Sequence, residues 1–170
     1  MGQPYLTLGL FSEPAFKARA AQMARALSGE ELAPVVVGLE GEFGSGKTTW
    51  VRGMLEGLGF RGQVPSPTYA LVEPYNLGKL TLVHLDLYRL ACPEDLEDIG
   101  VRDWLSRPDV WLLVEWPERA PMLKTCCDVL MRFEIVGSLG RSISLSSQTD
   151  CGCTILKALS DPETDSRNSL

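Results

Sequence analysis

The segment GEFGSGKT carries the clearest chemical pattern in the chain: it runs from Gly41 to Thr48 and matches G-x-x-x-x-G-K-[ST]. Gly41, Gly44 and Gly46 let the backbone wrap closely around a phosphate, so that successive N–H groups can point at its oxygens. Lys47 can neutralise the β- and γ-phosphates of a nucleotide, and the Thr48 hydroxyl can bind Mg²⁺. The spacing therefore predicts a nucleotide site.

The surroundings of this segment favour the same interpretation. An unbroken apolar run over 34–41 indicates a strand covered on both faces, and residues 46–58 are typical of a helix. A helix that begins at the glycine-rich turn adds the positive end of its dipole to the same anion. The alternative is a glycine-rich turn without a ligand, which the order strand, turn, helix does not favour.

A phosphate-binding loop of this kind needs a second, metal-positioning carboxylate at the end of a neighbouring strand. Asp86 closes the strand-like run 80–86, and Glu115 closes the run 111–115. Because the carboxyl ends of parallel strands face one crevice, both side chains are expected beside the phosphate loop. The alternative for either residue alone is an ordinary strand-end charge that meets water. We predict a functional role for both.

Three further features lie near these carboxylates in the sequence. The loop 66–69 carries hydroxyls, including that of Thr68, that could sense the γ-phosphate or the metal as switch loops do; a simple proline-rich connector fits equally well. His84 shares a strand face with Asp86 because it lies two residues earlier, and a structural hydrogen bond is its expected role. Trp116 is expected to pack, or to act as a lever beside the site.

Apolar patterning predicts the elements that position these residues. A strand over 6–10 is expected at an edge, followed by a helix with Ser12 at its start and Gly29 at its end. The other expected elements are a hairpin of strands over 68–73 and 80–87, one or two short helices within 92–106, a strand over 109–115, an antiparallel pair over 129–136 and 141–145, and a tail over 148–170 that is poorly structured or forms a short helix. This pattern predicts one α/β domain over 1–147, a P-loop-type three-layer sandwich with a mainly parallel central sheet and an antiparallel hairpin at one edge.

Composition narrows the class of protein. The 170 residues are 45% hydrophobic and 22% charged, as is usual for one globular domain. The formal net charge of −6 argues against an autonomous nucleic-acid binder. Five cysteines without a Cys-x-x-Cys pair and a single histidine offer little material for a zinc site, so reduced thiols in the cytoplasm are expected. Neither a signal peptide nor a stretch of about 18 apolar residues is recognised, so no membrane association is expected.

The wider pattern resembles the TsaE (YjeE) family, the small P-loop ATPases of bacterial threonylcarbamoyladenosine synthesis on tRNA. The similarity covers the chain from about Leu8 to Ser147. The blocks that carry it are GEFGSGKTT (41–49), SPTYALVEPY (66–75), HLDLYRL (84–90), PEDLEDIGVRDW (93–104) and LVEWP (113–117). The combination of SPTY, DLYRL and an EW pair makes the resemblance specific.

The resemblance implies roles for individual residues. Asp86 would stand at the Walker-B-like position, Glu115 would be a metal-linked or catalytic acid, and Thr68 resembles a switch residue. Glu13 would lie near the base of the nucleotide, and Arg141 would be the late arginine of the family. The implied nucleotide-binding set is Glu13, Gly41, Gly44, Ser45, Gly46, Lys47, Thr48, Thr49, Trp116 and Arg141; the implied catalytic set is Asp86, Glu115 and Thr68; the implied metal ligands are Thr48, Asp86 and Glu115.

The resemblance also implies a function, an ATPase that uses ATP, ADP and Mg²⁺ and supports N6-threonylcarbamoyladenosine (t6A) formation in tRNA by binding a TsaB–TsaD-type complex. It implies a chain that is monomeric alone and meets tRNA only through that partner. Glu42, Phe43 and Ser45 depart from the Asp, Leu and Ala usual in the family, but these positions lend backbone to the loop, so nucleotide binding is expected to survive.

Two other functions stay open. A small-molecule P-loop kinase would need an arginine-bearing lid, and only Arg89 adds a basic side chain between Lys79 and Arg102. A binding module that uses ATP without hydrolysing it would share every motif named above. A GTPase-type switch is disfavoured because the chain has no Asn-Lys-x-Asp stretch.

Overall fold

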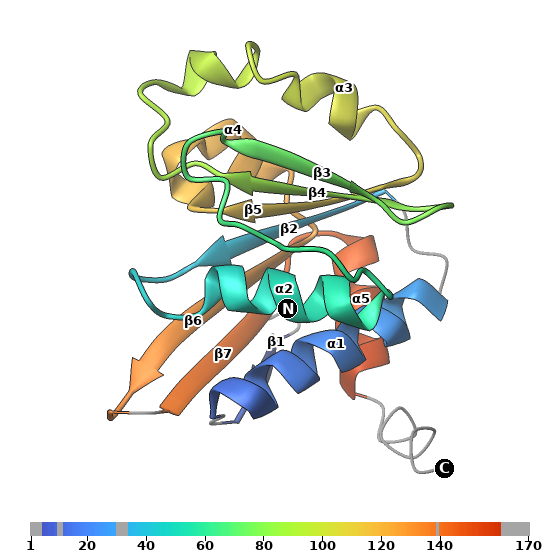
Figure 1. Ribbon diagram of the computed structural model, residues 1–170, viewed down its shortest axis with the longest axis vertical. Coiled ribbons are helices and arrows are strands. Elements are labelled where there is room, and N and C mark those ends of the chain that lie inside the picture. The colour runs from blue at the N-terminus through green and yellow to red at the C-terminus, as the bar shows by residue number, and fades with distance from the viewer. Residues whose placement is uncertain (1–4, 10–11, 30–33, 139, 161–170) are drawn as a thin grey trace.

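A computed structural model describes residues 5–9, 12–29, 34–138 and 140–160, which form an α/β domain around one mixed sheet (Figure 1). The strands are β1 (Tyr5–Leu8), β2 (Val35–Glu40), β3 (Val72–Asn76), β4 (Thr81–Asp86), β5 (Val110–Glu115), β6 (Val129–Val136) and β7 (Gly140–Ser147). The helices are α1 (Glu13–Gly29), α2 (Lys47–Gly57), α3 (Val101–Leu105), α4 (Pro121–Thr125) and α5 (Asp150–Ser160), with 3₁₀ turns at Pro93–Leu96 and Pro117–Arg119.

The centre of the sheet is parallel, as the sequence predicts. The strand order is β1-β7-β6-β2-β5-β4-β3, in which β6, β2, β5 and β4 run parallel to one another. Antiparallel strands lie at both edges, β3 at one and β7 with β1 at the other. The expected hairpin edge and the expected antiparallel pair of 129–136 with 141–145 are therefore both present. Short connections join β3 to β4 and β6 to β7, and a short connection permits only antiparallel pairing.

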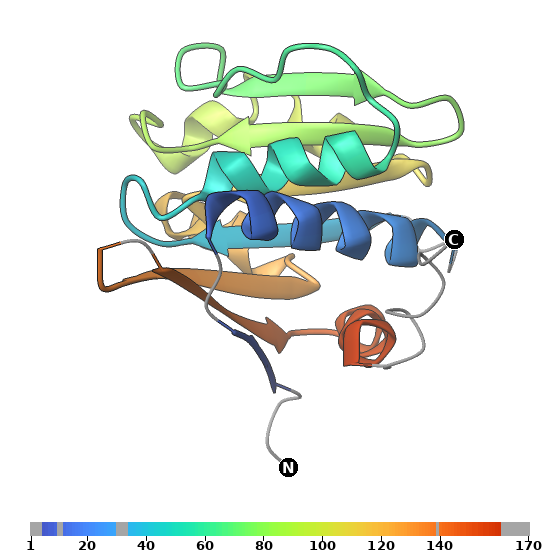
Figure 2. The same cartoon turned by 60° about the horizontal axis from the view of Figure 1, so that its bottom comes forward.

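The sheet is covered on both faces, which makes the three layers of the predicted sandwich. Alternate residues of a strand serve opposite faces: Val37 of β2 packs with α1, α2 and α5, and Val36 packs with residues of α3 and α4. Figure 2 shows α1 and α2 side by side in front of the sheet. Within the described part of the chain, no helix has the length and apolar character needed to cross a membrane.

The first strand of the β3–β4 hairpin begins at Val72, and the prediction that it begins at Thr68 is wrong. Residues 68–70 form a turn, which the Leu71 N–H closes by donating to the Pro67 carbonyl at 2.7 Å. Leu71 itself has a φ of 63°, a left-handed conformation that cannot continue a strand. Ser66 and Thr68, which carry the hydroxyls, therefore belong to a loop and not to a strand of the sheet.

The chain beyond Ser147 contributes to the core through α5. Ile155 is completely buried and Leu156 is 3% exposed, and both join the cluster beneath α1 and α2. The expected boundary at 147 therefore does not separate α5 from the domain, because a helix whose apolar side is buried packs as part of it. The end of the expected tail, 161–170, lies outside the described residues, as does Leu10 of the first expected strand.

Replacing Gly152 with alanine tests the packing of α5. A Cβ at this position would lie 2.0 Å from the Asp128 carbonyl oxygen, so the helix must move away from the sheet. The clash outweighs the gain of about 1 kcal/mol in helix propensity, and we expect Gly152→Ala to lower the free energy of unfolding by about 2 kcal/mol or more. Urea unfolding measures this change.

Thr154→Ala, an exposed substitution on the same helix, is the matched control and should shift stability by less than about 0.5 kcal/mol. Equal stability of the two variants would show that α5 does not pack as described.

The five cysteines are free thiols. Cys92 and Cys126 are exposed, whereas Cys127 is buried, and burial raises the pKa of the Cys127 thiol to about 12. Cys127 is therefore an apolar core residue rather than a reactive group.

Candidate nucleotide-binding site

The glycine-rich segment folds into a turn between β2 and α2. Gly41 has a φ of 146°, and a Cβ there would lie 2.6 Å from the Phe133 carbonyl oxygen, so no other residue fits. Gly46 has a φ of 107° and stands at the N-cap of α2 without a side-chain hydrogen bond to the first turn. The first N–H groups of α2 thus receive no cap from this residue, which suits an anion.

A pocket of about 230 Å³ opens in front of this turn, at the carboxyl ends of β4 and β5. Twelve residues from four segments line it: Phe43, Gly44, Gly46, Lys47, Thr48, Thr49, Ser66, Thr68, Asp86, Tyr88, Glu115 and Trp116. The phosphate loop, both predicted carboxylates and the proline-rich loop therefore meet in one cavity. Gly41, Ser45, Glu13 and Arg141 are the predicted site residues that do not line it.

Lys47 is held inside the turn. Its Nζ donates to the carbonyl oxygens of Gly41 at 2.5 Å and Glu42 at 2.9 Å, and it lies 4.2 Å from the centre of the Trp116 ring. Desolvation by burial lowers the pKa of Lys47, against the opposing charges of Glu115, Glu118 and Asp86. The ammonium thus has partners that phosphate oxygens can replace.

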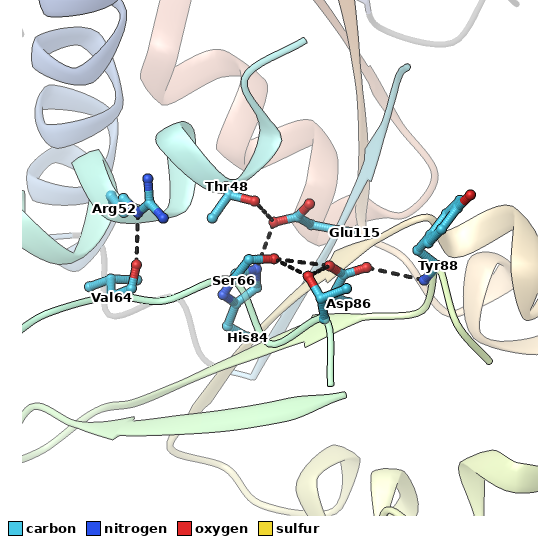
Figure 3. Close-up of polar contacts among 9 residues, drawn as sticks. Thr48, Arg52, Val64, Ser66, His84, Asp86, Tyr88 and Glu115 are labelled. Atoms are coloured by element: carbon cyan, nitrogen blue, oxygen red, sulfur yellow. Dashed lines mark hydrogen bonds and ion pairs between the residues drawn. The ribbon is translucent and has the colours of Figure 1, made fainter. Parts of the chain in front are cut away.

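Glu115 is the carboxylate that contacts the phosphate loop (Figure 3). Its Oε1 accepts a hydrogen bond from the Thr48 hydroxyl at 2.7 Å and lies 2.8 Å from His84 Nε2. The residue is 3% exposed. Strand order explains the contact, because β5 is the direct neighbour of β2, from which the loop departs.

Asp86 lies one strand further from the loop and is paired in register with Glu115. Its Oδ2 accepts hydrogen bonds from the hydroxyls of Ser66 at 3.1 Å and Thr68 at 3.3 Å, and its Oδ1 accepts one from the Tyr88 N–H at 3.1 Å. Asp86 is therefore tied to the loop 66–68, and the contact with Thr48 that a Walker-B-like position implies belongs to Glu115 instead.

The loop before β3 is fixed to α2 as well as to Asp86. Arg52 of α2 donates from Nε to the Val64 carbonyl at 2.7 Å (Figure 3). The hydroxyls of Ser66 and Thr68 lie 2.8 Å apart. A loop with two prolines and these anchors holds its hydroxyls at the pocket wall.

Three aromatic rings line the pocket: Trp116, which the resemblance implies, and Phe43 and Tyr88, which no sequence motif predicts. The ring centre of Phe43 lies 4.3 Å from that of Tyr88 and 5.1 Å from that of Trp116, and Tyr88 and Trp116 are 5.2 Å apart. Trp116 has a φ of 59°, a left-handed conformation that turns the chain after β5. Phe43 and Tyr88 have no signal in the sequence, because no periodicity marks rings that come together only in the tertiary structure.

Two residues implied by the resemblance lie at different distances from the loop. Arg141 of β7 reaches it, since its Nη2 donates to the Gly44 carbonyl at 3.1 Å. Glu13 is exposed at the start of α1, and within the described ranges no hydrogen bond or ion pair links it to the pocket. The Ser45 hydroxyl is buried and has no hydrogen-bond partner among the described residues, so this side chain packs within the turn.

The donor set of the pocket suits a hard cation. Thr48, Glu115 and Asp86 offer only oxygen atoms, which Mg²⁺ prefers, and Mg²⁺ is usually held by one or two carboxylates together with substrate phosphates. Among the residues that the structure describes, no group of three or more His, Cys, Asp or Glu side chains could hold a metal by itself. A metal here would thus depend on phosphate oxygens as co-ligands.

Comparison with known proteins shows the family to which this chain is similar. The sequence profile of the family described as "Threonylcarbamoyl adenosine biosynthesis protein TsaE" matches residues 11–143. The chain is 42% identical over 127 residues to a "tRNA threonylcarbamoyladenosine biosynthesis protein TsaE" of Haemophilus influenzae, covering 75% of this chain and 79% of that protein. It is 36% identical over 134 residues to the protein of the same description from Nostoc sp., covering 76% and 79%.

A solved structure shares the fold. The crystal structure of YdiB from Bacillus subtilis superposes with a TM-score of 0.72, covers 94% of this chain and 97% of its own, and is 24% identical in sequence.

Proposed function

The chain belongs to the TsaE family of threonylcarbamoyl adenosine biosynthesis proteins, and from this we propose that it is an Mg²⁺-dependent ATPase supporting t6A formation in tRNA. The observation that carries the proposal is the contact between Thr48 and Glu115 inside a pocket that also holds Lys47. A phosphate-binding lysine, a metal-binding hydroxyl and a carboxylate are the parts that phosphoryl transfer to water requires.

Each part has a task that its position supports. Lys47 exchanges the carbonyls of Gly41 and Glu42 for phosphate oxygens and neutralises their charge. Thr48 and Glu115 would hold Mg²⁺, which supplies charge neutralisation at the phosphates when it is bound. The Thr48 hydroxyl gives its hydrogen to Glu115 and so keeps its lone pairs for the cation.

Asp86 and the loop 66–68 line the side of the pocket opposite the glycine-rich turn 41–48. Because the Ser66 and Thr68 hydroxyls both donate to Asp86, a change in the loop is transmitted directly to that carboxylate. We assign to this group the orientation of the attacking water and the response to the γ-phosphate.

The proposed partner is a TsaB–TsaD-type complex, which performs the carbamoyl transfer and handles most of the tRNA. The net charge of −6 supports this division, since an acidic chain docks more readily on a protein than on a polyanion. We expect the chain to be monomeric without that partner and to work in the cytoplasm.

Turnover measurements test the proposal against both alternatives. We expect slow hydrolysis of ATP by the purified chain, stimulation by the TsaB–TsaD complex, and a preference for ATP over GTP because the guanine-reading Asn-Lys-x-Asp stretch is missing. Phosphate release is measured with each nucleotide, alone and with the complex.

ATP binding without hydrolysis in either condition would favour the nonhydrolytic module. Phosphate transfer to an added small molecule would favour the kinase. GTP binding as tight as ATP binding, in competition, would contradict the expected adenine preference.

A further inference from the structure

We propose that His84 is a positioning residue for Glu115: its ring N–H fixes the carboxylate in the orientation that the metal-binding half of the site requires. This inference rests on the proposed nucleotide function and extends it to a residue that touches neither phosphate nor the pocket. His84 is absent from the pocket lining and is completely buried behind Glu115.

The register of the sheet places the two side chains together. His84 of β4 is paired with Leu113 of β5, and Asp86 is paired with Glu115 two residues later on each strand. Because side chains alternate between faces, all four project to the face that carries α2. His84 and Glu115 are therefore diagonal neighbours, and the separation of Nε2 from Oε1 is 2.8 Å.

The surroundings of the ring determine which nitrogen carries the hydrogen. Nδ1 is buried and has no hydrogen-bond partner among the described residues, whereas Nε2 faces a carboxylate, which only accepts. The tautomer with hydrogen on Nε2 satisfies the donor and leaves only a lone pair unpaired. Hydrogen on Nδ1 would bury a donor without an acceptor and set a lone pair against the carboxylate oxygen.

The two carboxylate oxygens of Glu115 differ in their hydrogen bonds. Oε1 accepts from both Thr48 and His84, which fixes the torsion of the carboxylate. Oε2 receives no hydrogen bond within the described residues and belongs to a side chain that lines the pocket. His84 thus orients Glu115 from the side away from the pocket. Outer-shell donors orient metal ligands in the same way in other proteins, and losing such a donor typically weakens metal binding about 10- to 100-fold.

The wild-type protein permits a direct spectroscopic test because His84 is the only histidine of the chain. Long-range ¹H–¹⁵N correlation of an untagged, ¹⁵N-labelled sample reports which imidazole nitrogen bears hydrogen. We expect a protonated Nε2 and a pyridine-like Nδ1. Hydrogen on Nδ1 of a neutral ring would overturn the proposal, whether or not the protein binds nucleotide.

Substitution tests the consequence for the metal. Calorimetry measures the affinity for ADP with Mg²⁺ and with EDTA, and the ratio of the two affinities isolates the metal contribution. We expect His84→Leu to lower this ratio about 10-fold or more with little effect on the EDTA value. His84→Gln, whose amide nitrogen can stand near the position of Nε2, should restore most of the ratio.

Leu82→Val is the control, because Leu82 is a buried residue of the same strand face and its truncation loosens packing without removing a donor. A wild-type ratio in folded His84→Leu, or an equal loss in Leu82→Val, would overturn the inference. Should His84→Leu fail to fold, the tautomer of the wild-type protein decides it. A wild-type protein that binds no nucleotide would instead refute the proposed function, and the tautomer would still decide the contact.

Discussion

Calorimetry of the Lys47→Ala variant is expected to show a loss of Mg-ATP affinity on the order of 10²- to 10⁴-fold, which corresponds to two charge-assisted hydrogen bonds of about 1.5–3 kcal/mol each. Lys47 is 5% exposed and its ammonium already lies at the centre of the phosphate turn. In the alanine variant the Gly41 and Glu42 carbonyls lose this donor. A bound nucleotide loses the cation that would neutralise its phosphates.

The fold should tolerate this substitution, because burial already disfavours the charge on Lys47 and lowers its pKa. Thermal unfolding of the variant checks this point. Lys79→Ala is the matched control, since Lys79 is an exposed lysine in the turn between β3 and β4. Unchanged ATP affinity in folded Lys47→Ala would refute the assignment of Gly41–Thr48 as the phosphate site.

Glu115→Gln and Asp86→Asn are each expected to lower partner-stimulated ATP hydrolysis by about 10²-fold or more at saturating Mg²⁺. Both substitutions keep size and most hydrogen bonds, so the fold should survive. The reasons for the two losses differ. Glu115→Gln removes a negative charge next to Thr48, whereas Asp86→Asn disturbs the anchor of the Ser66 and Thr68 hydroxyls.

The two variants should therefore separate in a binding assay. Glu115→Gln is expected to weaken the Mg²⁺-dependent part of nucleotide affinity, and Asp86→Asn is expected to lower the rate with little effect on affinity. Asp103→Asn, an exposed carboxylate on α3, is the control for a simple change of charge. Wild-type hydrolysis in both Glu115→Gln and Asp86→Asn would leave these side chains as ordinary strand ends, worth a few tenths of a kcal/mol to stability.

The features of this site that depend on neighbouring residues in the sequence can be predicted from the sequence. The sequence predicts the turn 41–48 between a strand and a helix, because glycine spacing and a preceding apolar run are properties of adjacent residues. It predicts Asp86 and Glu115 at strand ends for the same reason, and they do end β4 and β5. The parallel centre of the sheet followed from strands that alternate with helices along the chain.

Long-range contacts account for what local patterns missed. The predicted start of β3 is wrong because a left-handed Leu71 ends the preceding turn, and no local pattern marks that conformation in leucine. The segment after Ser147 reads as polar and small, yet its few apolar residues, Ile155 and Leu156, complete a core built by β-strands and helices far away in sequence. Whether these two side chains are buried depends on the space that the other helices and strands leave between them.

Local sequence is enough to identify the side chains able to bind a phosphate or a metal: Lys47, Thr48, Asp86 and Glu115 all line one pocket, as their motifs predict. Which of these side chains contact one another depends on the order of the strands in the sheet. Because β5 lies between β2 and β4, Glu115 meets Thr48 and Asp86 meets the loop 66–68. Strand order and register are set by burial across the whole sheet, so no spacing along the chain could show that His84 supports Glu115 rather than Asp86 on its own strand.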